Sequence, residues 1–124
     1  MPIGGTPQVE EILCRGVEPV KIPDPGDAGT IEVSHPGYCE LTSAGAGETR
    51  TLPDPVFRGQ IIDFVMVVDG GGDIAITVSS PTNQAGNTTI TFTDIGEHCR
   101  VIGFYNPTDG WEWRQVCNDG AGLS

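Results

Sequence analysis

The sequence predicts an all-β protein: a compact antiparallel β-sandwich or barrel, jelly-roll-like, preceded by an extended N-terminal arm. Three observations predict this class. Apolar and polar residues alternate over short runs rich in Val, Ile, Phe and Thr, which is typical of half-buried strands. The 124 residues include 18 glycines and 10 prolines, so turns are frequent and long helices are disfavoured. The strand-like runs also follow one another at the short spacing found in sandwiches and barrels.

Residues 1–29 are predicted to form the arm, and residues 30–124 the β domain. A Thr-Pro pair at residues 6–7 suits the start of a short helix. The apolar face of such a helix packs either on its own domain or on a partner, and the three prolines between residues 17 and 29 favour a segment that leaves its domain. We expect the arm to contact neighbouring subunits through four apolar anchors: Ile3, Val9, Ile12 and Leu13.

Short strands are expected at residues 30–33, 38–42 and 48–52, where β-branched and aromatic residues lie between turn formers. The centre of the chain is predicted to be a hairpin within residues 60–93. Its first strand, 61–68, places alternate apolar residues on one face, and the glycines at 70–72 suit a tight reversal. The expected cross-strand pairs are Val68 with Ile74, Met66 with Ile76, and Phe64 with Val78.

The last strands are predicted at residues 90–92, 98–105 and 111–117, the final two joined by a loop at 106–110. If Tyr105 pairs with Trp111, then Gly103 lies opposite Trp113, where a ring can cover the bare backbone. The same register places Cys99 opposite Cys117, within reach of a disulfide.

The formal net charge of −11 argues against nucleic-acid binding and against binding to an anionic membrane surface. No apolar run is long enough to span a membrane. The start of the sequence shows no secretory signal, so we expect thiols that are reduced in a cytosol during assembly.

The residue pattern contains no known catalytic motif, and we predict that the protein is not an enzyme and has no cofactor and no metal. His98 and Cys99 are adjacent on a strand, so they point to opposite faces and cannot share a proton directly. Asp69 and Asp73 lack the order of a calcium loop. A zinc site is conceivable from four residues, but their spacing is not diagnostic: His98, Cys39, Cys99 and Cys117. Three aromatic residues suit either packing or stacking on sugar rings: Tyr105, Trp111 and Trp113.

Several short segments between residues 38 and 124 resemble a known family. They are Leu-Thr-Ser-Ala-Gly-Ala-Gly-Glu-Thr-Arg-Thr-Leu-Pro-Asp-Pro at 41–55, Gly-Gln at 59–60, Val-Asp-Gly-Gly at 68–71, Gly-Asn-Thr-Thr-Ile-Thr-Phe at 86–92, Trp-Arg at 113–114 and Asn-Asp-Gly-Ala-Gly-Leu-Ser at 118–124. Together they resemble small β-rich virion proteins of tailed bacteriophages, most of all the head decoration, or cement, proteins.

The resemblance implies a non-enzymatic homotrimer on the outer capsid surface, assembled in the host cytoplasm. Such a trimer lies at local or true three-fold axes and fastens neighbouring major capsid subunits against internal DNA pressure. The same motifs are met in phage fibre and spike modules. The alternative is therefore a carbohydrate-binding β-module of a fibre or tail spike that uses Tyr105, Trp111 and Trp113.

Overall fold

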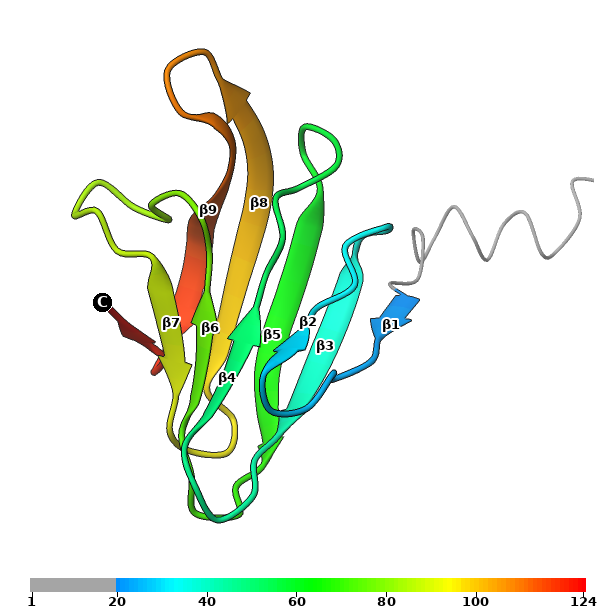
Figure 1. Cartoon of the computed structure of the whole chain (residues 1–124), viewed down its shortest axis with the longest axis vertical. Helices are drawn as coiled ribbons and strands as arrows, with labels where there is room; N and C mark the ends of the chain where they lie inside the picture. Colours follow the sequence, from blue (N-terminus) through cyan, green and yellow to red (C-terminus); the bar gives the residue numbers. More distant parts are fainter. Residues whose placement is uncertain (1–19) are drawn as a thin grey trace, which may run out of the picture.

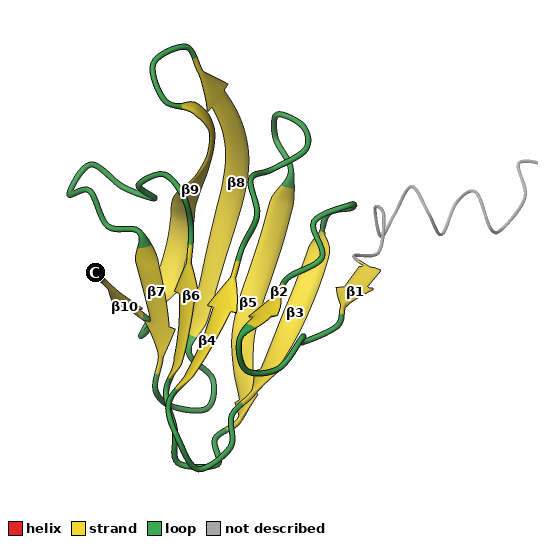
Figure 2. Ribbon diagram, viewed as in Figure 1, coloured by secondary structure: helices red, strands yellow, loops and turns green. Residues whose placement is uncertain are grey.

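The computed structural model describes residues 20–124, which form two mixed five-stranded sheets packed face to face (Figures 1 and 2). The all-β prediction is confirmed. The long-stranded sheet has the order β1 (Val20–Ile22), β3 (Gly37–Thr42), β5 (Ile61–Val68), β8 (His98–Asn106) and β9 (Gly110–Asp119). The short-stranded sheet has the order β10 (Gly122–Leu123), β7 (Thr89–Phe92), β6 (Ile74–Thr77), β4 (Glu48–Thr51) and β2 (Gly29–Thr30).

From β1 to β6 the chain crosses from one sheet to the other at every connection. As a result β1, β3 and β5 are parallel neighbours in one sheet, and β2, β4 and β6 are parallel neighbours in the other. Every antiparallel pair includes at least one of the strands β7 to β10: β5 with β8, β6 with β7, β7 with β10, and β8 with β9. The antiparallel arrangement predicted for the whole domain therefore describes its second half, and the first half is a stack of strand–turn–strand arches.

The predicted central hairpin is wrong in its pairing, although its faces are right. β5 and β6 do not pair with each other, because they lie in different sheets. Phe64 pairs with Cys39 and Cys99, and Ile76 pairs with Arg50 and Ile90. Ile62, Phe64 and Met66 of β5 and Ile74 and Ile76 of β6 are fully buried, so they meet across the core instead of side by side within one sheet. Val68, expected on the same face, is 48% exposed.

The glycines at 70–72 allow the turns of two neighbouring arches to pack closely against each other. Gly70 N donates to Ser43 O at 3.1 Å, and Gly72 N donates to Ala44 O at 2.9 Å. A Cβ on Gly72 would lie 1.9 Å from Ala46 O, and one on Gly70 would lie 2.5 Å from Ser43 O. The glycines are therefore required because the 69–73 turn lies directly on the 43–47 turn.

The core lies between the two sheets and is almost entirely apolar. Its largest members, each with at most 1% of its surface exposed, are Trp113, Phe64, Phe92, Ile22, Ile31, Leu41, Leu52, Ile62, Met66, Ile74 and Ile76. Burial of such side chains stabilises a domain by roughly 1.5–3 kcal/mol each. The sandwich is thus closed by residues from both the parallel and the antiparallel halves.

Arg50 is a fully buried cation within this core. Its Nε and Nη2 donate to the two carboxylate oxygens of Asp24 at 2.7 and 3.1 Å. Its Nη1 lies 2.9 Å from Glu48 Oε1, and its Nη2 also donates to Thr42 O at 3.2 Å. The guanidinium therefore ties the turn after β1, the end of β3 and the start of β4 together.

The predicted boundary of the arm at residue 29 needs correction. Val20–Ile22 is the edge strand of one sheet, and Gly29 begins β2 in the other. Ile22 is fully buried. Prolines flank β1, and an edge strand tolerates them because its outer edge makes no ladder hydrogen bonds. Residues 20–29 thus belong to the sandwich, while the predicted helix and the four apolar anchors lie outside the described residues.

The final hairpin has the predicted register from its tip down to the pair of Val101 and Gln115. Tyr105 pairs with Trp111, and Gly103 pairs with Trp113. A β-bulge between Arg100 and Val101 then shifts the pairing, so that Cys99 lies opposite Asn118 and Cys117 lies opposite Arg100. The predicted Cys99–Cys117 pair is therefore wrong, because one extra residue in β9 moves the two cysteines apart.

Candidate interaction surfaces at the two ends of the sandwich

An aromatic and cationic group lies at the hairpin end of the molecule. The rings of Tyr105 and Trp111 meet edge to face, with centroids 5.3 Å apart and planes at 70°. The guanidinium carbon of Arg58 lies 5.3 Å from the Tyr105 centroid and 5.8 Å from the Trp111 centroid. These distances are within the range of cation–π attraction, so the arginine covers both rings.

Large apolar side chains are exposed around this group. We define the hairpin-end patch as Val56, Phe57 and Tyr105, which are 53%, 44% and 44% exposed. Phe104 is also exposed, but it precedes Tyr105 on β8 and therefore points to the other face of that strand. The loop that carries Val56 and Phe57 lies against β8, since Gly59 N donates to Gly103 O at 2.8 Å. Aromatic residues and arginine are enriched where protein interfaces bind most strongly.

Buried Gln60 fixes the loop that presents the patch. Its side-chain oxygen accepts from Val56 N at 2.8 Å, and its side-chain nitrogen donates to Val33 O at 2.8 Å. Gln60 is fully buried. The backbone under Val56 and Phe57 is therefore preorganised, which lowers the entropy lost when a partner binds.

Trp113 does not belong to this surface. The side chain is 1% exposed, and its Nε1 donates to Pro53 O at 2.7 Å. Of the three aromatic residues predicted for a ligand or an interface, the structure brings Tyr105 and Trp111 together and places Trp113 in the core. The expected cover of Gly103 is supplied by Pro55, whose Cβ would lie 2.4 Å from a Cβ at that glycine.

A second apolar surface lies at the opposite end of the sandwich, where the arches turn (Figure 1). We define the arch-end patch as Val67, Val68 and Ile95. Gly96 N donates to Met66 O at 2.8 Å, and Met66 N donates to Glu97 O at 3.0 Å. These bonds hold the loop of Ile95, which is 65% exposed, beside the end of β5.

An ion cluster lies on the long-stranded sheet. Asp63 accepts from His98 Nε2 at 2.8 Å and from Arg100 Nε at 2.9 Å. Burial alone would raise the pKa of the Asp63 carboxyl, but the hydrogen bonds from Arg100 and His98 outweigh burial and hold that pKa below its ordinary value. His98 and Arg100 thus both pair with Asp63 on a half-exposed surface.

The described cysteines do not form a reactive group. Cys39 and Cys99 are buried, Cys117 is exposed, and all three are free thiols. Burial raises the pKa of Cys39 to about 12 and that of Cys99 to about 11. Both buried thiols therefore remain protonated at neutral pH, and a protonated thiol is a poor nucleophile.

Sequence reasoning missed Arg58, Val56 and Phe57, which it treated as part of a connection between strands. Nothing in the local pattern distinguishes an exposed loop phenylalanine from a buried one. A Val-Phe-Arg run between turn formers was the available signal.

Within residues 20–124, no group of three or more His, Cys, Asp or Glu is placed to hold a metal ion. The same part of the chain has no helix of the length and apolarity needed to cross a membrane. Comparison with protein-family models finds no matching family, and comparison with curated proteins finds no match either.

Proposed function

We propose that this chain is a capsid decoration, or cement, protein, which binds the outer surface of a phage head as a homotrimer and stabilises contacts between major capsid subunits. The observation that supports this proposal is the presence of two exposed apolar patches at opposite ends of one rigid sandwich. A protein that fastens neighbours together needs at least two contact surfaces, whereas a module that captures one ligand needs one.

The net charge of −11 fits the same role. Mutual repulsion keeps an acidic chain soluble before assembly. The charge also favours a partner whose contact surface is basic, since complementary charge speeds encounter and excludes wrong partners. The major capsid protein is the partner in this proposal.

The test is binding of the purified protein to shells that assemble without it. Phe57→Ser with Tyr105→Ser removes both aromatic side chains of the hairpin-end patch, and Ile95→Ser removes the most exposed side chain of the arch-end patch. Each should weaken binding at least about tenfold if the surface carries an interface hot spot. The matched control is Val116→Ser, which removes a side chain that is 50% exposed and outside both patches.

Unchanged binding of both patch variants would contradict the proposed contact surfaces. Cryo-electron density of the particle tests the location, because decoration requires repeated density over the icosahedral shell. Light scattering tests the homotrimer, and a strict monomer both free and on the particle would exclude it.

The alternative, sugar stacking on Tyr105, Trp111 and Trp113, loses support from the placement of these rings. Trp113 is buried, and Arg58 already lies over the other two rings. A sugar would have to displace the arginine before it could stack there. Density confined to tail appendages would nevertheless favour a fibre or spike module over decoration.

A further inference from the structure

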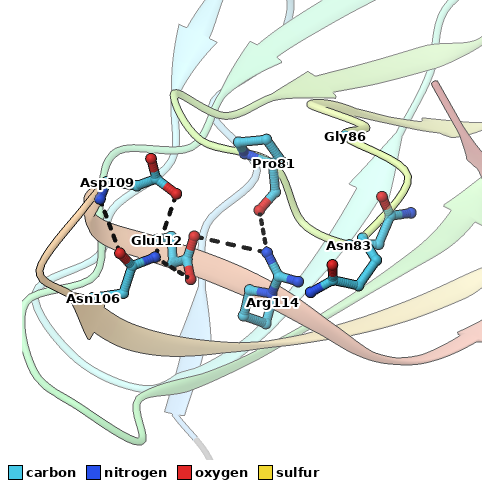
Figure 3. A pocket seen from close by; sticks show the side chains of 8 residues that line it. Pro81, Asn83, Gly86, Asn106, Asp109, Glu112 and Arg114 are labelled. Atoms are coloured by element: carbon cyan, nitrogen blue, oxygen red, sulfur yellow. Dashed lines mark hydrogen bonds and ion pairs between the residues drawn. The ribbon is translucent and has the colours of Figure 1, made fainter.

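A polar cleft of about 400 Å³ lies between the β6–β7 loop and the β8–β9 hairpin (Figure 3). The loop contributes Asn83 and Gln84, and the hairpin contributes Asn106, Asp109, Glu112 and Arg114. In Figure 1 the β6–β7 loop and the loop of the hairpin-end patch stand on opposite sides of the β8–β9 hairpin. The cleft is therefore distinct from the loop of the hairpin-end patch, although both border the β8–β9 hairpin, on which Phe104 pairs with Glu112.

Both walls of the cleft are fixed. Arg114 Nη1 donates to Pro81 O at 3.1 Å, and Gln115 N donates to Thr82 O at 2.8 Å. These bonds attach the loop to β9. Asn83 and Asn87 bond to each other across the loop at 2.8 and 3.1 Å. The cleft is thus preformed, as sites for small ligands usually are.

Asn106 sets the orientation of the acidic groups. Its Oδ1 accepts from Thr108 N at 2.8 Å and from Asp109 N at 2.9 Å. Its Nδ2 must therefore point the other way, and it donates to Glu112 Oε1 at 3.1 Å and to Asp109 Oδ2 at 3.4 Å. The Asn106 amide nitrogen thus occupies the position between the two carboxylates. A metal ion bound there would need an oxygen ligand and not a hydrogen-bond donor, so this arrangement disfavours metal binding.

The charges that line the cleft further limit the class of ligand that can bind there. Glu112 is 7% exposed, and its Oε2 lies 3.7 Å from Arg114 Nη1. Asp109 and Glu112 would repel an anionic ligand, and Arg114, paired with Glu112, offsets part of the attraction that the two acids have for a cationic one. Apolar ligands are disfavoured because polar groups dominate the lining and would lose their hydration without new hydrogen bonds.

A ligand that is neutral and rich in hydroxyl groups satisfies all these conditions. Each hydroxyl can donate to a carboxylate and accept from the guanidinium or from the Gln84 amide. The volume lies within the roughly 300–1,000 Å³ of small-molecule sites. We propose that this cleft binds a short neutral saccharide, held by Asp109, Glu112, Arg114 and Gln84, with an affinity on the order of 1 mM.

The test is a titration of the full-length ¹⁵N-labelled protein, followed by its amide NMR shifts, with glucose, galactose, mannose, N-acetylglucosamine and their β-1,4-linked disaccharides. At least one saccharide should shift the side-chain amides of Asn106 and Gln84, with saturation near about 10 mM. Glu112→Gln should weaken that binding at least about tenfold, because it removes a charged hydrogen-bond acceptor.

Gln84→Ala gives a second test that does not depend on a buried group, because this side chain is exposed in a loop. It should also weaken binding, whereas Asp119→Asn, outside the cleft, should leave binding unchanged. Parallel titrations use calcium chloride, inorganic phosphate and guanidinium chloride. Shifts at the cleft with one of these ions but with none of the sugars would overturn the proposal, as would no response to any sugar.

Discussion

At the residue scale, the buried pair of Arg50 and Asp24 connects electrostatics with stability. Burial alone would raise the pKa of the Asp24 carboxyl, but hydrogen bonds from Arg50, Thr42 and Gly26 outweigh it and hold the pKa below its ordinary 3.8. A carboxyl whose pKa is lower in the folded state stabilises the fold above its unfolded pKa. That stabilisation is lost as the pH falls through the folded pKa.

We predict that Asp24→Asn lowers the free energy of unfolding by about 2–3 kcal/mol near neutral pH, because Arg50 then keeps Glu48 as its only carboxylate. The variant should also lose much of the acid sensitivity that the wild type shows below pH 3.8. Urea unfolding near neutral pH and at about pH 2.5 measures both effects.

Asp63→Asn is the matched control. The pKa of Asp63 is also held low, but its partner Arg100 has 44% of its side chain exposed, whereas Arg50 has none. Exposed ion pairs contribute little, so this variant should keep most of the wild-type acid sensitivity. Equal acid sensitivity in wild type and Asp24→Asn would refute the role given to the buried pair.

A second residue-scale prediction concerns Gly103. Alanine there would place Cβ 2.4 Å from Pro55 Cβ, so either β8 or the loop after β4 must move. We expect Gly103→Ala to destabilise the fold by about 1–3 kcal/mol. Gly47→Ala is the control, because nothing lies within 4 Å of a Cβ at that position. Denaturant midpoints compare the two, and similar midpoints would count against close packing of Pro55.

At the scale of strands and turns, local alternation predicted which residues face the core but not which strands pair. Ile62, Phe64 and Met66 alternate in the same way whether β6 lies beside them or across the core. The choice depends on the 43–47 turn, which receives the glycines of the 69–73 turn. Because that contact joins segments far apart in sequence, local alternation does not reveal it. The triple glycine taken alone therefore indicates a hairpin turn.

The bulge in β9 leads to a prediction about thiol reactivity. In a Cys14→Ser background, which removes the cysteine outside the described residues, one thiol should react quickly with Ellman's reagent in the native protein. That thiol is Cys117, since Cys39 and Cys99 are buried and protonated. The other two should react only after unfolding.

The control for this experiment is Cys117→Ser in the same background, which should have no fast thiol. Mass spectrometry after mild oxidation tests for the result that would contradict the shifted register. A disulfide between Cys99 and Cys117 would mean that the bulge is absent in solution, because the shifted register places these residues opposite different partners.

At the scale of the whole molecule, composition and turn spacing were enough to predict the all-β class. They did not predict that β1 belongs to the sandwich, because three residues between prolines carry no pattern that stands out from a connector. Nor could they predict the cleft, whose walls are brought together only when Arg114 bonds to Pro81.

Two truncations test the boundary of the sandwich. Removal of residues 1–19 should leave a cooperative β-rich fold, whereas removal of residues 1–29 should not. The longer deletion removes Ile22 and Asp24, worth roughly 2 and 3 kcal/mol. Their sum is comparable to the total stability of a small domain, roughly 5–15 kcal/mol.

Circular dichroism and thermal melting measure the fold of both truncations. If residues 1–19 contact the shell, the shorter deletion should also reduce binding to capsids while the β signal stays intact. A folded 30–124 fragment with wild-type stability would show that β1 and Asp24 are dispensable, contrary to the observed pairing.

The parallel pairing of β1 with β3 has a mechanical consequence. A pull at the amino end of Val20, directed along the strand, loads all the hydrogen bonds of the β1 ladder at the same time, because parallel strands slide past each other in shear instead of opening one bond after another. If β1 slipped, the tension would reach Asp24, two residues beyond its end, which is tied to the buried guanidinium of Arg50 by two hydrogen bonds. The ion pair therefore stops the edge strand from being drawn out of the sheet when the amino-terminal side of the domain is under load.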